Sequence, residues 1–142
     1  MSLDLETARS MIAATRAAGR DLGLQPLTVV VLDPGGHVIA AEREDGASMG
    51  RFQIAYGKAH GALALGLGSR ALLARAEQQP YFIAAAGAAL GGSLVPVPGG
   101  VLIRDQESRL LGGIGVSGDS SDNDERAALA GIEAVHLVGQ PG

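Results

Sequence analysis

The chain has no cysteine and no tryptophan, and its 142 residues include only two phenylalanines and two tyrosines. Without cysteine, the protein forms no disulfide and has no thiolate to offer to a metal or a substrate. With so few aromatic rings, it has almost no surface on which nucleic-acid bases can stack. These absences exclude a disulfide scaffold and cysteine catalysis, and they argue against a single-strand nucleic-acid binder.

Basic charge is also in short supply, because 15 acidic side chains outnumber 11 lysines and arginines and the formal net charge is −4. This balance argues against nucleic acid and anionic membranes as partners. No apolar run in the sequence is long enough and free enough of charge to span a bilayer. Residues 1–6 lack the basic start and apolar core of a signal peptide, so we expect a cytoplasmic protein.

Small residues are abundant instead, and 22 of them are glycines. Small side chains bury little apolar area each, at about 25 cal/mol per Å², so a core built from them gains from close backbone approach and from burial between subunits. The length suits a single domain over residues 1–142. We therefore expect a homo-oligomer, with a monomer of closely packed helices as the alternative.

Hydrophobic periodicity predicts the order of helices and strands. Apolar residues repeat at helical spacing over 5–22, and two apolar runs, 27–32 and 37–43, form a hairpin around a Pro-Gly-Gly turn. The remaining predicted elements are helices at 52–67, 69–76 (capped by Ser69) and 81–89, strands at 101–104 and 109–116, and a closing helix at 122–138. Hairpins imply an antiparallel sheet flanked by helices, an α+β fold of order α-β-β-α-α-β-β-(β)-α.

The stretch from Gly112 to Glu125 joins the last predicted strand to the closing helix. Its glycines allow the backbone to approach a neighbour or a ligand, because no β-carbon stands in the way. Its serines and aspartates suit a helix cap, and Asp122 and Glu125 stand at the separation of a capping box. A junction of this kind is well suited to binding a ligand.

The glycines of this stretch match the dinucleotide fingerprint literally, as Gly113-x-Gly115-x-x-Gly118. A dinucleotide site also needs a following strand that ends in an acidic residue, and no strand is expected after the closing helix. NAD and FAD are therefore rejected. Two interpretations stay open: the glycines pack a strand tightly against a helix, or their N–H groups line a ligand.

Three blocks of the sequence stand out together: Val30–His37 with Arg43–Ala47, then Lys58-Ala59, then Gly113–Gly118 followed by Asp124-Glu125 and Ala130-Gly131. In this order they resemble the GlcG/HbpS family, which is often described as haem-degrading and is related to the C-terminal domain of PduO. The resemblance spans nearly the whole chain. It implies a profilin-like α+β fold and, as ligand, haem or a related tetrapyrrole.

Candidate ligand-binding residues gather at two places in the sequence. Arg43 and Asp45 lie where the second predicted strand turns toward a helix, and an arginine there can grip a carboxylate at two points. The alternative is a solvated loop in which Asp45 caps a turn. The full set of candidate ligand-binding residues is Arg43, Asp45, Arg51, Gly115, Ser117 and Gly118.

Lys58 is the candidate catalytic residue, because it interrupts an otherwise apolar helix. A lysine in this position usually extends its ammonium to water. If Lys58 faces a pocket instead, it can hold a carboxylate or move protons together with Asp124 or Glu125.

The three imidazoles, His37, His60 and His136, show no spacing typical of a metal site, so a structural role is expected for each. Haem needs only one axial ligand, which the absence of cysteine restricts to histidine or oxygen. The sequence does not choose among these.

The leading functional hypothesis is a small-ligand-binding protein of the GlcG/HbpS kind, with haem or a related tetrapyrrole near a subunit interface. The alternative is an isomerase, lyase or hydrolase that acts on a small carboxylate-bearing metabolite. In that case Arg43 or Arg51 anchors the acid while Lys58 and the acidic residues move protons. A third possibility is an accessory subunit without a ligand of its own.

Overall fold

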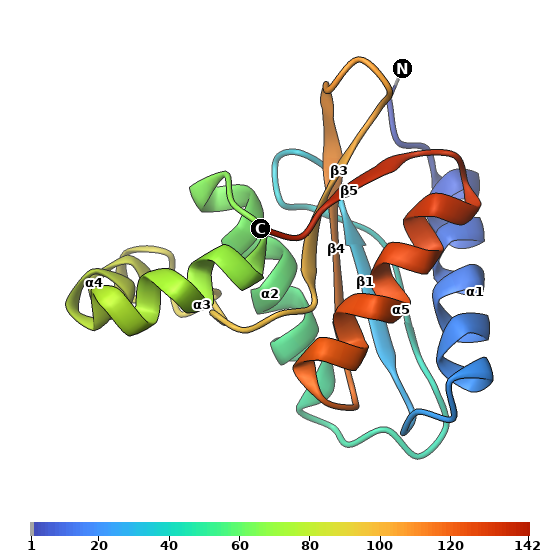
Figure 1. The fold of residues 1–142 in the computed structure, drawn as a ribbon, viewed down its shortest axis with the longest axis horizontal. Helices are drawn as coiled ribbons and strands as arrows, with labels where there is room; N and C mark the ends of the chain where they lie inside the picture. Colours follow the sequence, from blue (N-terminus) through green and yellow to red (C-terminus); the bar gives the residue numbers. More distant parts are fainter. Residues whose placement is uncertain (1) are drawn as a thin grey trace.

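A computed structural model describes residues 2–142 and shows one five-stranded sheet with helices on both faces (Figure 1). Its strands stand in the order β2-β1-β4-β3-β5, and all neighbouring strands are antiparallel. In chain order the elements are α1 (Leu5–Asp21), β1 (Thr28–Leu32), β2 (Val38–Arg43), α2 (Arg51–Leu65), α3 (Ser69–Gln78), α4 (Pro80–Ala89), β3 (Gly100–Arg104), β4 (Leu110–Ser117), α5 (Ser121–Ala134) and β5 (Val138–Gln140). The expected α+β fold with an antiparallel sheet is confirmed.

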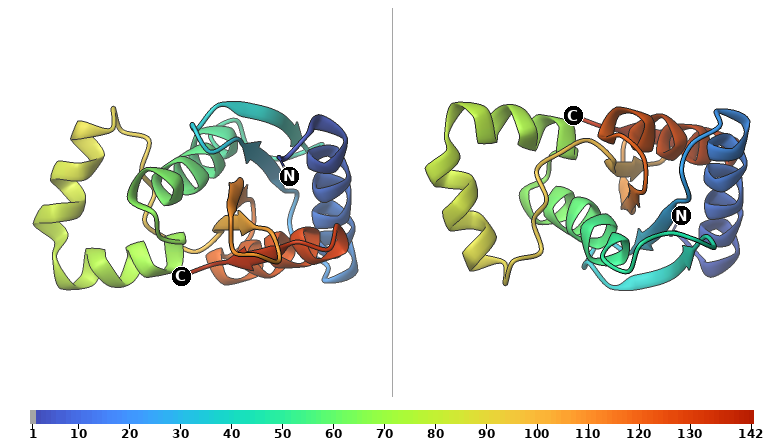
Figure 2. Two further views of the ribbon diagram at one scale, coloured as in Figure 1. Left: turned by 90° about the horizontal axis from the view of Figure 1, so that it is seen from above. Right: turned by 90° about the horizontal axis from the view of Figure 1, so that it is seen from below.

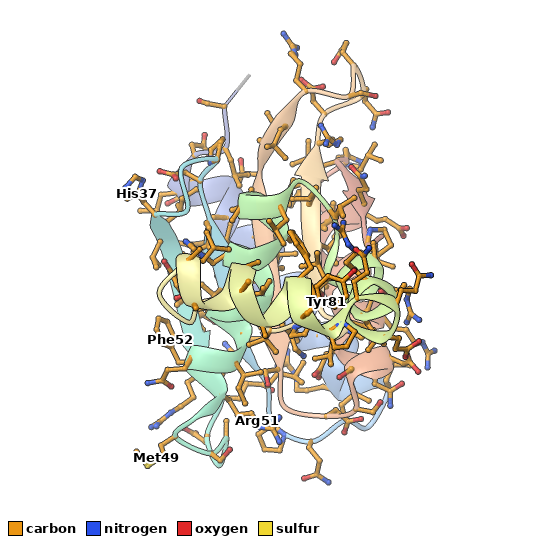
Figure 3. The ribbon with its side chains drawn as sticks, turned by 90° about the vertical axis from the view of Figure 1, so that its left-hand side faces the viewer. His37, Met49, Arg51, Phe52 and Tyr81 are labelled. Carbon is orange, nitrogen blue, oxygen red and sulfur yellow. The ribbon has the colours of Figure 1, made fainter. Side chains whose placement is uncertain are left out.

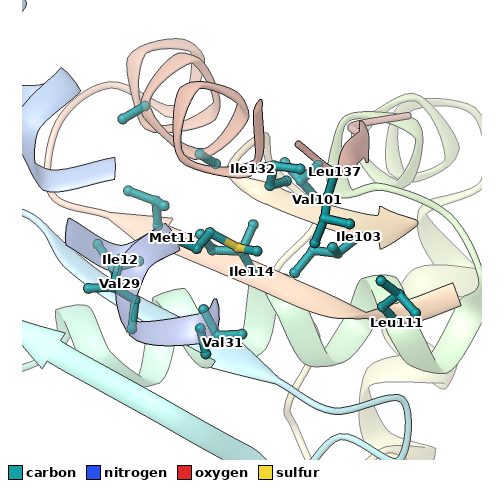
Figure 4. Close-up of a cluster of buried hydrophobic side chains, with 14 of the residues drawn as sticks. Met11, Ile12, Val29, Val31, Val101, Ile103, Leu111, Ile114, Ile132 and Leu137 are labelled. Carbon is teal, nitrogen blue, oxygen red and sulfur yellow. The ribbon is translucent and has the colours of Figure 1, made fainter. Parts of the chain in front are cut away.

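The larger core lies between the sheet and the pair α1 and α5, which pack against each other (Figures 1 and 4). Met11 and Ile12 of α1 and Ile132 of α5 meet Ile114 of β4 there, and all four side chains are fully buried. Helical spacing in α1 and β-branched residues in the strands place these side chains on facing surfaces.

The opposite face of the sheet is covered by α2, and small residues let this helix come unusually close (Figure 2). Ala55 and Ala59 are its inward residues against β1 and β4. A β-carbon on Gly115 of β4 would overlap the carbonyl oxygen of Ala55. The glycine of the strand is therefore what allows the helix backbone to rest on the sheet.

Helices α3 and α4 meet at a corner and together project away from the sheet (Figures 1 and 2). The packing of α4 is mainly against α3, and none of its residues is buried. Residues 80–89 carry no charged side chain, and Tyr81 is 71% exposed. An apolar helix of this kind leaves surface that the monomer does not cover. Over residues 2–142 no helix is both long and apolar enough to cross a bilayer.

The end of the chain differs from the sequence prediction. Helix α5 stops at Ala134, and the chain turns through His136, whose φ of +61° is left-handed, into β5. This strand was not expected, because three residues are too few to show a strand pattern. It pairs antiparallel with β3 and ends at Gln140, so the expectation that no strand follows the closing helix was wrong.

Two predicted helix caps were also wrong. Ser120 caps α5 by accepting a hydrogen bond from the N–H of Asn123, and the Asp122–Glu125 box does not form. Ser69 lies inside α3, where its hydroxyl bonds both the N–H and the carbonyl of Gly100. At α5 a neighbouring serine takes the cap position, and at α3 a tertiary contact engages the serine hydroxyl that was expected to cap the helix.

Candidate functional site

Lys58 lies on the inner face of α2 and is one of the largest buried side chains of the protein. Its ammonium donates hydrogen bonds to the carbonyl oxygen of Val116, at 2.8 Å, and to Oδ2 of Asp124, at 3.1 Å. The Lys58 side chain is 2% exposed and the Asp124 side chain 1%. The ammonium therefore neither reaches water nor faces an open pocket.

Asp124 is held by a second contact, because its Oδ1 accepts a hydrogen bond from the N–H of Asp119 at 2.9 Å. The residue lies in the first turn of α5, where the helix dipole favours a negative charge. Lys58 and Asp124 thus join α2, the end of β4 and the start of α5. The structure brings together two of the three candidate catalytic residues.

Burial lowers the pKa of Lys58, because the charged ammonium loses its water. The carboxylate of Asp124 opposes this shift by charge and by hydrogen bonding, and the positive charge of Arg51 adds a smaller lowering. The net pKa of Lys58 lies below its usual value.

The space next to the ammonium is occupied by backbone. A β-carbon on Gly99 would lie 2.8 Å from Nζ of Lys58, and one on Gly100 would overlap the Lys58 carbonyl. The two glycines therefore let the start of β3 close over the lysine. A substrate carboxylate has no room beside Nζ in this arrangement.

Arg51 and Ser117 lie next to this buried pair. Arg51, at the start of α2, donates a hydrogen bond of 3.1 Å to the hydroxyl of Ser117. Ser117 is buried. Arg51 is only half-buried, and Figure 3 shows it at the N-terminal end of α2. The neighbouring Gly118 has the backbone of Pro26 where a β-carbon would stand. Both Gly115 and Gly118 therefore contact protein backbone at close range.

The remaining predicted site residues lie elsewhere. Arg43 and Asp45 are exposed, and within residues 2–142 no hydrogen bond or ion pair joins either of them to Lys58. Glu125 binds Arg70, with 3.0 Å between its Oε1 and Nε of the arginine. Hydrogen bonds from the guanidinium to Glu125 and Asp122 raise the pKa of Arg70. Glu125 therefore forms a separate ion pair near the surface.

A recess of about 130 Å³ lies at the other end of α2, next to the turn between β1 and β2. Its lining consists of Pro34 to Gly36 of the turn, His60, Leu63 and Ala64 of α2, and Leu90 at the end of α4. From the sequence alone, a structural role was expected for His60. The available signal was the spacing of Phe52, Tyr56 and His60, which places three rings on one helix face.

These rings stack along α2, with centroids 6.2 Å apart for Phe52 and Tyr56 and 5.3 Å apart for Tyr56 and His60. His37 lies near the same turn but points outward, with 82% of its side chain exposed (Figure 3). Across residues 2–142 no three histidine and acidic side chains gather in a way that could hold a metal ion. The recess therefore combines apolar walls with one imidazole.

Comparison with solved structures finds the same fold in several proteins. A complex of PduOC with haem is 24% identical and covers 96% of this chain and 97% of its own, with a TM-score of 0.85. The Klebsiella pneumoniae protein ORFY is 23% identical, with 93% and 89% covered and a TM-score of 0.82. A double mutant of Streptomyces reticuli HbpS is 27% identical, with 94% and 86% covered and a TM-score of 0.78.

A search of curated proteins finds no match. The sequence profile of the family described as "Haem degrading protein HbpS-like" matches residues 3–133, which is nearly the whole chain. This chain is therefore a member of the HbpS-like family.

Proposed function

We propose that this protein binds haem or a related tetrapyrrole, in a site that a second copy of the chain completes. The observation that carries the proposal is the recess beside His60, which offers apolar walls from Leu63 and Leu90 and a single imidazole. Membership of a family described as haem-degrading supports it, as does a structural neighbour that holds haem.

The size of the recess supports a shared site. A site that buries a drug-sized ligand usually measures roughly 300–1,000 Å³. The recess measures about 130 Å³, so it receives one part of a macrocycle and leaves the remainder exposed. Because an exposed porphyrin face is strongly apolar, a second protein surface gains free energy by covering it.

Helix α4 supplies a surface suited to this contact. Its residues are apolar and uncharged, and none is buried in the monomer. Leu90, which follows the helix, also lines the recess. A second copy packed on α4 would therefore lie next to the ligand.

The rival enzyme hypothesis stays a prediction. The catalytic roles of Lys58, Asp124 and Glu125 need a ligand near the ammonium, and backbone now fills that space. Arg51 remains the one predicted ligand-binding cation close to the pair. Turnover of carboxylate metabolites by the purified protein would be the evidence for this hypothesis.

The experiment that tests haem binding is a titration of the purified protein with haemin, followed in the visible spectrum, with particle mass measured in parallel. We expect a saturable Soret band and a particle larger than the 14.3 kDa chain. An unchanged haemin spectrum in the presence of excess protein would overturn the proposal.

A further inference from the structure

The ring of His60 is fixed in one orientation by its neighbours. Nδ1 lies 2.9 Å from the carbonyl oxygen of Ser93, in the connection between α4 and β3. One face of the ring stacks on Tyr56 at an interplanar angle of 22°. The side chain is therefore oriented before any ligand arrives, which lowers the entropic cost of binding.

The same contact determines which nitrogen carries the proton. A carbonyl oxygen only accepts hydrogen bonds, so Nδ1 is the donor, and in the neutral imidazole Nε2 then holds a free lone pair. Within residues 2–142 no hydrogen bond engages Nε2 of His60. Metal-bound histidines have this arrangement, with the second nitrogen donating to a carbonyl or a carboxylate and raising the basicity of the ligand.

The edge of the ring that carries Nε2 is open because residue 36 is glycine. A β-carbon on Gly36 would lie 3.2 Å from Cδ2 and 3.6 Å from Nε2 of His60. The turn Pro34–Gly36 and the side chains of Leu63 and Leu90 form the rest of the recess. The lone pair thus lies at an opening lined by Leu63, Leu90 and the backbone of the turn, and within residues 2–142 no hydrogen bond engages it.

The other two imidazoles lack this setting. His37 is exposed, and its Nδ1 lies 3.3 Å from Asp33 on the outer side of the turn. His136 lies beyond the end of α5, where its carbonyl accepts a hydrogen bond from Gln106. Neither of them lines the recess.

We infer that Nε2 of His60 is the axial ligand to the iron of the bound haem. The inference rests on the haem-binding function proposed above and assigns the iron ligand within it. An imidazole of this kind is a common proximal ligand of haem iron, and cysteine is absent from the chain. Leu63, Leu90 and the glycine turn then contact the macrocycle around the iron.

The test compares haemin with metal-free protoporphyrin IX, which has the same macrocycle but no iron. Wild-type protein is expected to bind haemin at least tenfold more tightly than protoporphyrin IX. His60→Ala removes the iron ligand and keeps the apolar walls, so it is expected to bind the two porphyrins with similar Kd and to shift the Soret band. Added imidazole is expected to restore the wild-type band.

Two further variants serve as controls. His37→Ala removes an imidazole from the same turn and is expected to keep the wild-type preference for haemin. His60→Gln keeps an amide that can donate to the Ser93 carbonyl, so it preserves the local fold if alanine does not. His60→Gln is also expected to lose the preference for haemin.

The outcomes separate this inference from the proposed function. If wild-type protein binds haemin and the His60 variants keep its Soret band and its preference over protoporphyrin IX, His60 is not the ligand and haem binding stands. If wild-type protein binds neither porphyrin, the proposed function and the ligand assignment are both wrong.

Discussion

Nζ of Lys58 and Oδ2 of Asp124 lie 3.1 Å apart in the core, although 66 positions separate the two residues in the sequence. The lysine reaches from α2 past the end of β4 to the first turn of α5, and it also binds the Val116 carbonyl. A buried charge needs a partner and a full set of hydrogen bonds, and each of these residues supplies the other. The pair therefore joins α2, β4 and α5 within the core.

We expect Lys58→Met to destabilise the protein by about 3–5 kcal/mol, because it leaves Asp124 buried without a counter-charge. The measurement is urea unfolding followed by circular dichroism. In the matched control, Lys58→Met with Asp124→Asn, a neutral amide still accepts the Asp119 N–H. The double variant is expected to recover at least half of the loss, and a single variant as stable as wild type would contradict the structural role of the pair.

The stability of the protein is expected to increase with pH on the alkaline side. The pKa of Lys58 is lowered in the folded state by burial, whereas the unfolded chain keeps the usual value near 10.5. Below the pKa of the folded state, Lys58 is protonated in both the folded and the unfolded chain, so it does not make the free energy of unfolding depend on pH. Between the two values the unfolded state binds one more proton, so the free energy of unfolding rises with pH.

The reference for this measurement is the double variant with Lys58→Met and Asp124→Asn, which lacks the buried ion pair. The difference in unfolding free energy between wild type and this variant, taken at several pH values up to 10.5, isolates the contribution of Lys58. A difference that stays constant with pH, or moves in favour of the variant, would show that the lysine pKa is not lowered.

Gly115→Val is expected to lower the free energy of unfolding by about 1–3 kcal/mol. A β-carbon at this position overlaps the Ala55 carbonyl, so α2 must move off the sheet. The melting temperature reports the effect. Gly50→Ala is the matched control, since Gly50 has a φ of −80° and nothing within 4 Å of a β-carbon. Equal melting temperatures for the two variants would refute the close approach of α2 and β4.

Tyr81→Asp is expected to weaken self-association, because it places a charge on the exposed apolar face of α4. Met49→Asp adds the same charge at an 87% exposed residue outside α3 and α4 and is expected to leave the particle mass unchanged. Light scattering at micromolar concentration measures both. A wild-type particle near 14.3 kDa would refute the oligomer itself.

Local patterns predicted most of the fold, since helix and strand periods depend on near neighbours. The apolar repeat of α1, the hairpin of β1 and β2, and the uncharged helix α4 were all recognisable in this way. Strand β5 was not, because its three residues acquire their conformation by pairing with the edge of β3. Ser69 was assigned to a cap, whereas its hydroxyl bonds Gly100, 31 positions away.

The candidate site was only partly predictable for the same reason. Lys58 was singled out because it interrupts an otherwise apolar helix, with Asp124 as a possible partner, and the structure joins the two residues. Arg43 and Asp45 were also grouped with the site, although both remain exposed at the end of β2. The spacing of Phe52, Tyr56 and His60 indicated a row of rings, but the hydrogen-bond partner that orients His60 is Ser93, 33 positions away in the sequence.

The sequence by itself determined the family, the α+β class and the exclusion of cysteine chemistry, because these depend on residue types, on short periods and on the order of motifs along one chain. The tertiary structure decided which charges are buried, which glycines pack against backbone and which imidazole has a free nitrogen. Desolvation, close packing and hydrogen-bond direction depend on distances between residues far apart in the chain, and only the folded arrangement specifies those distances.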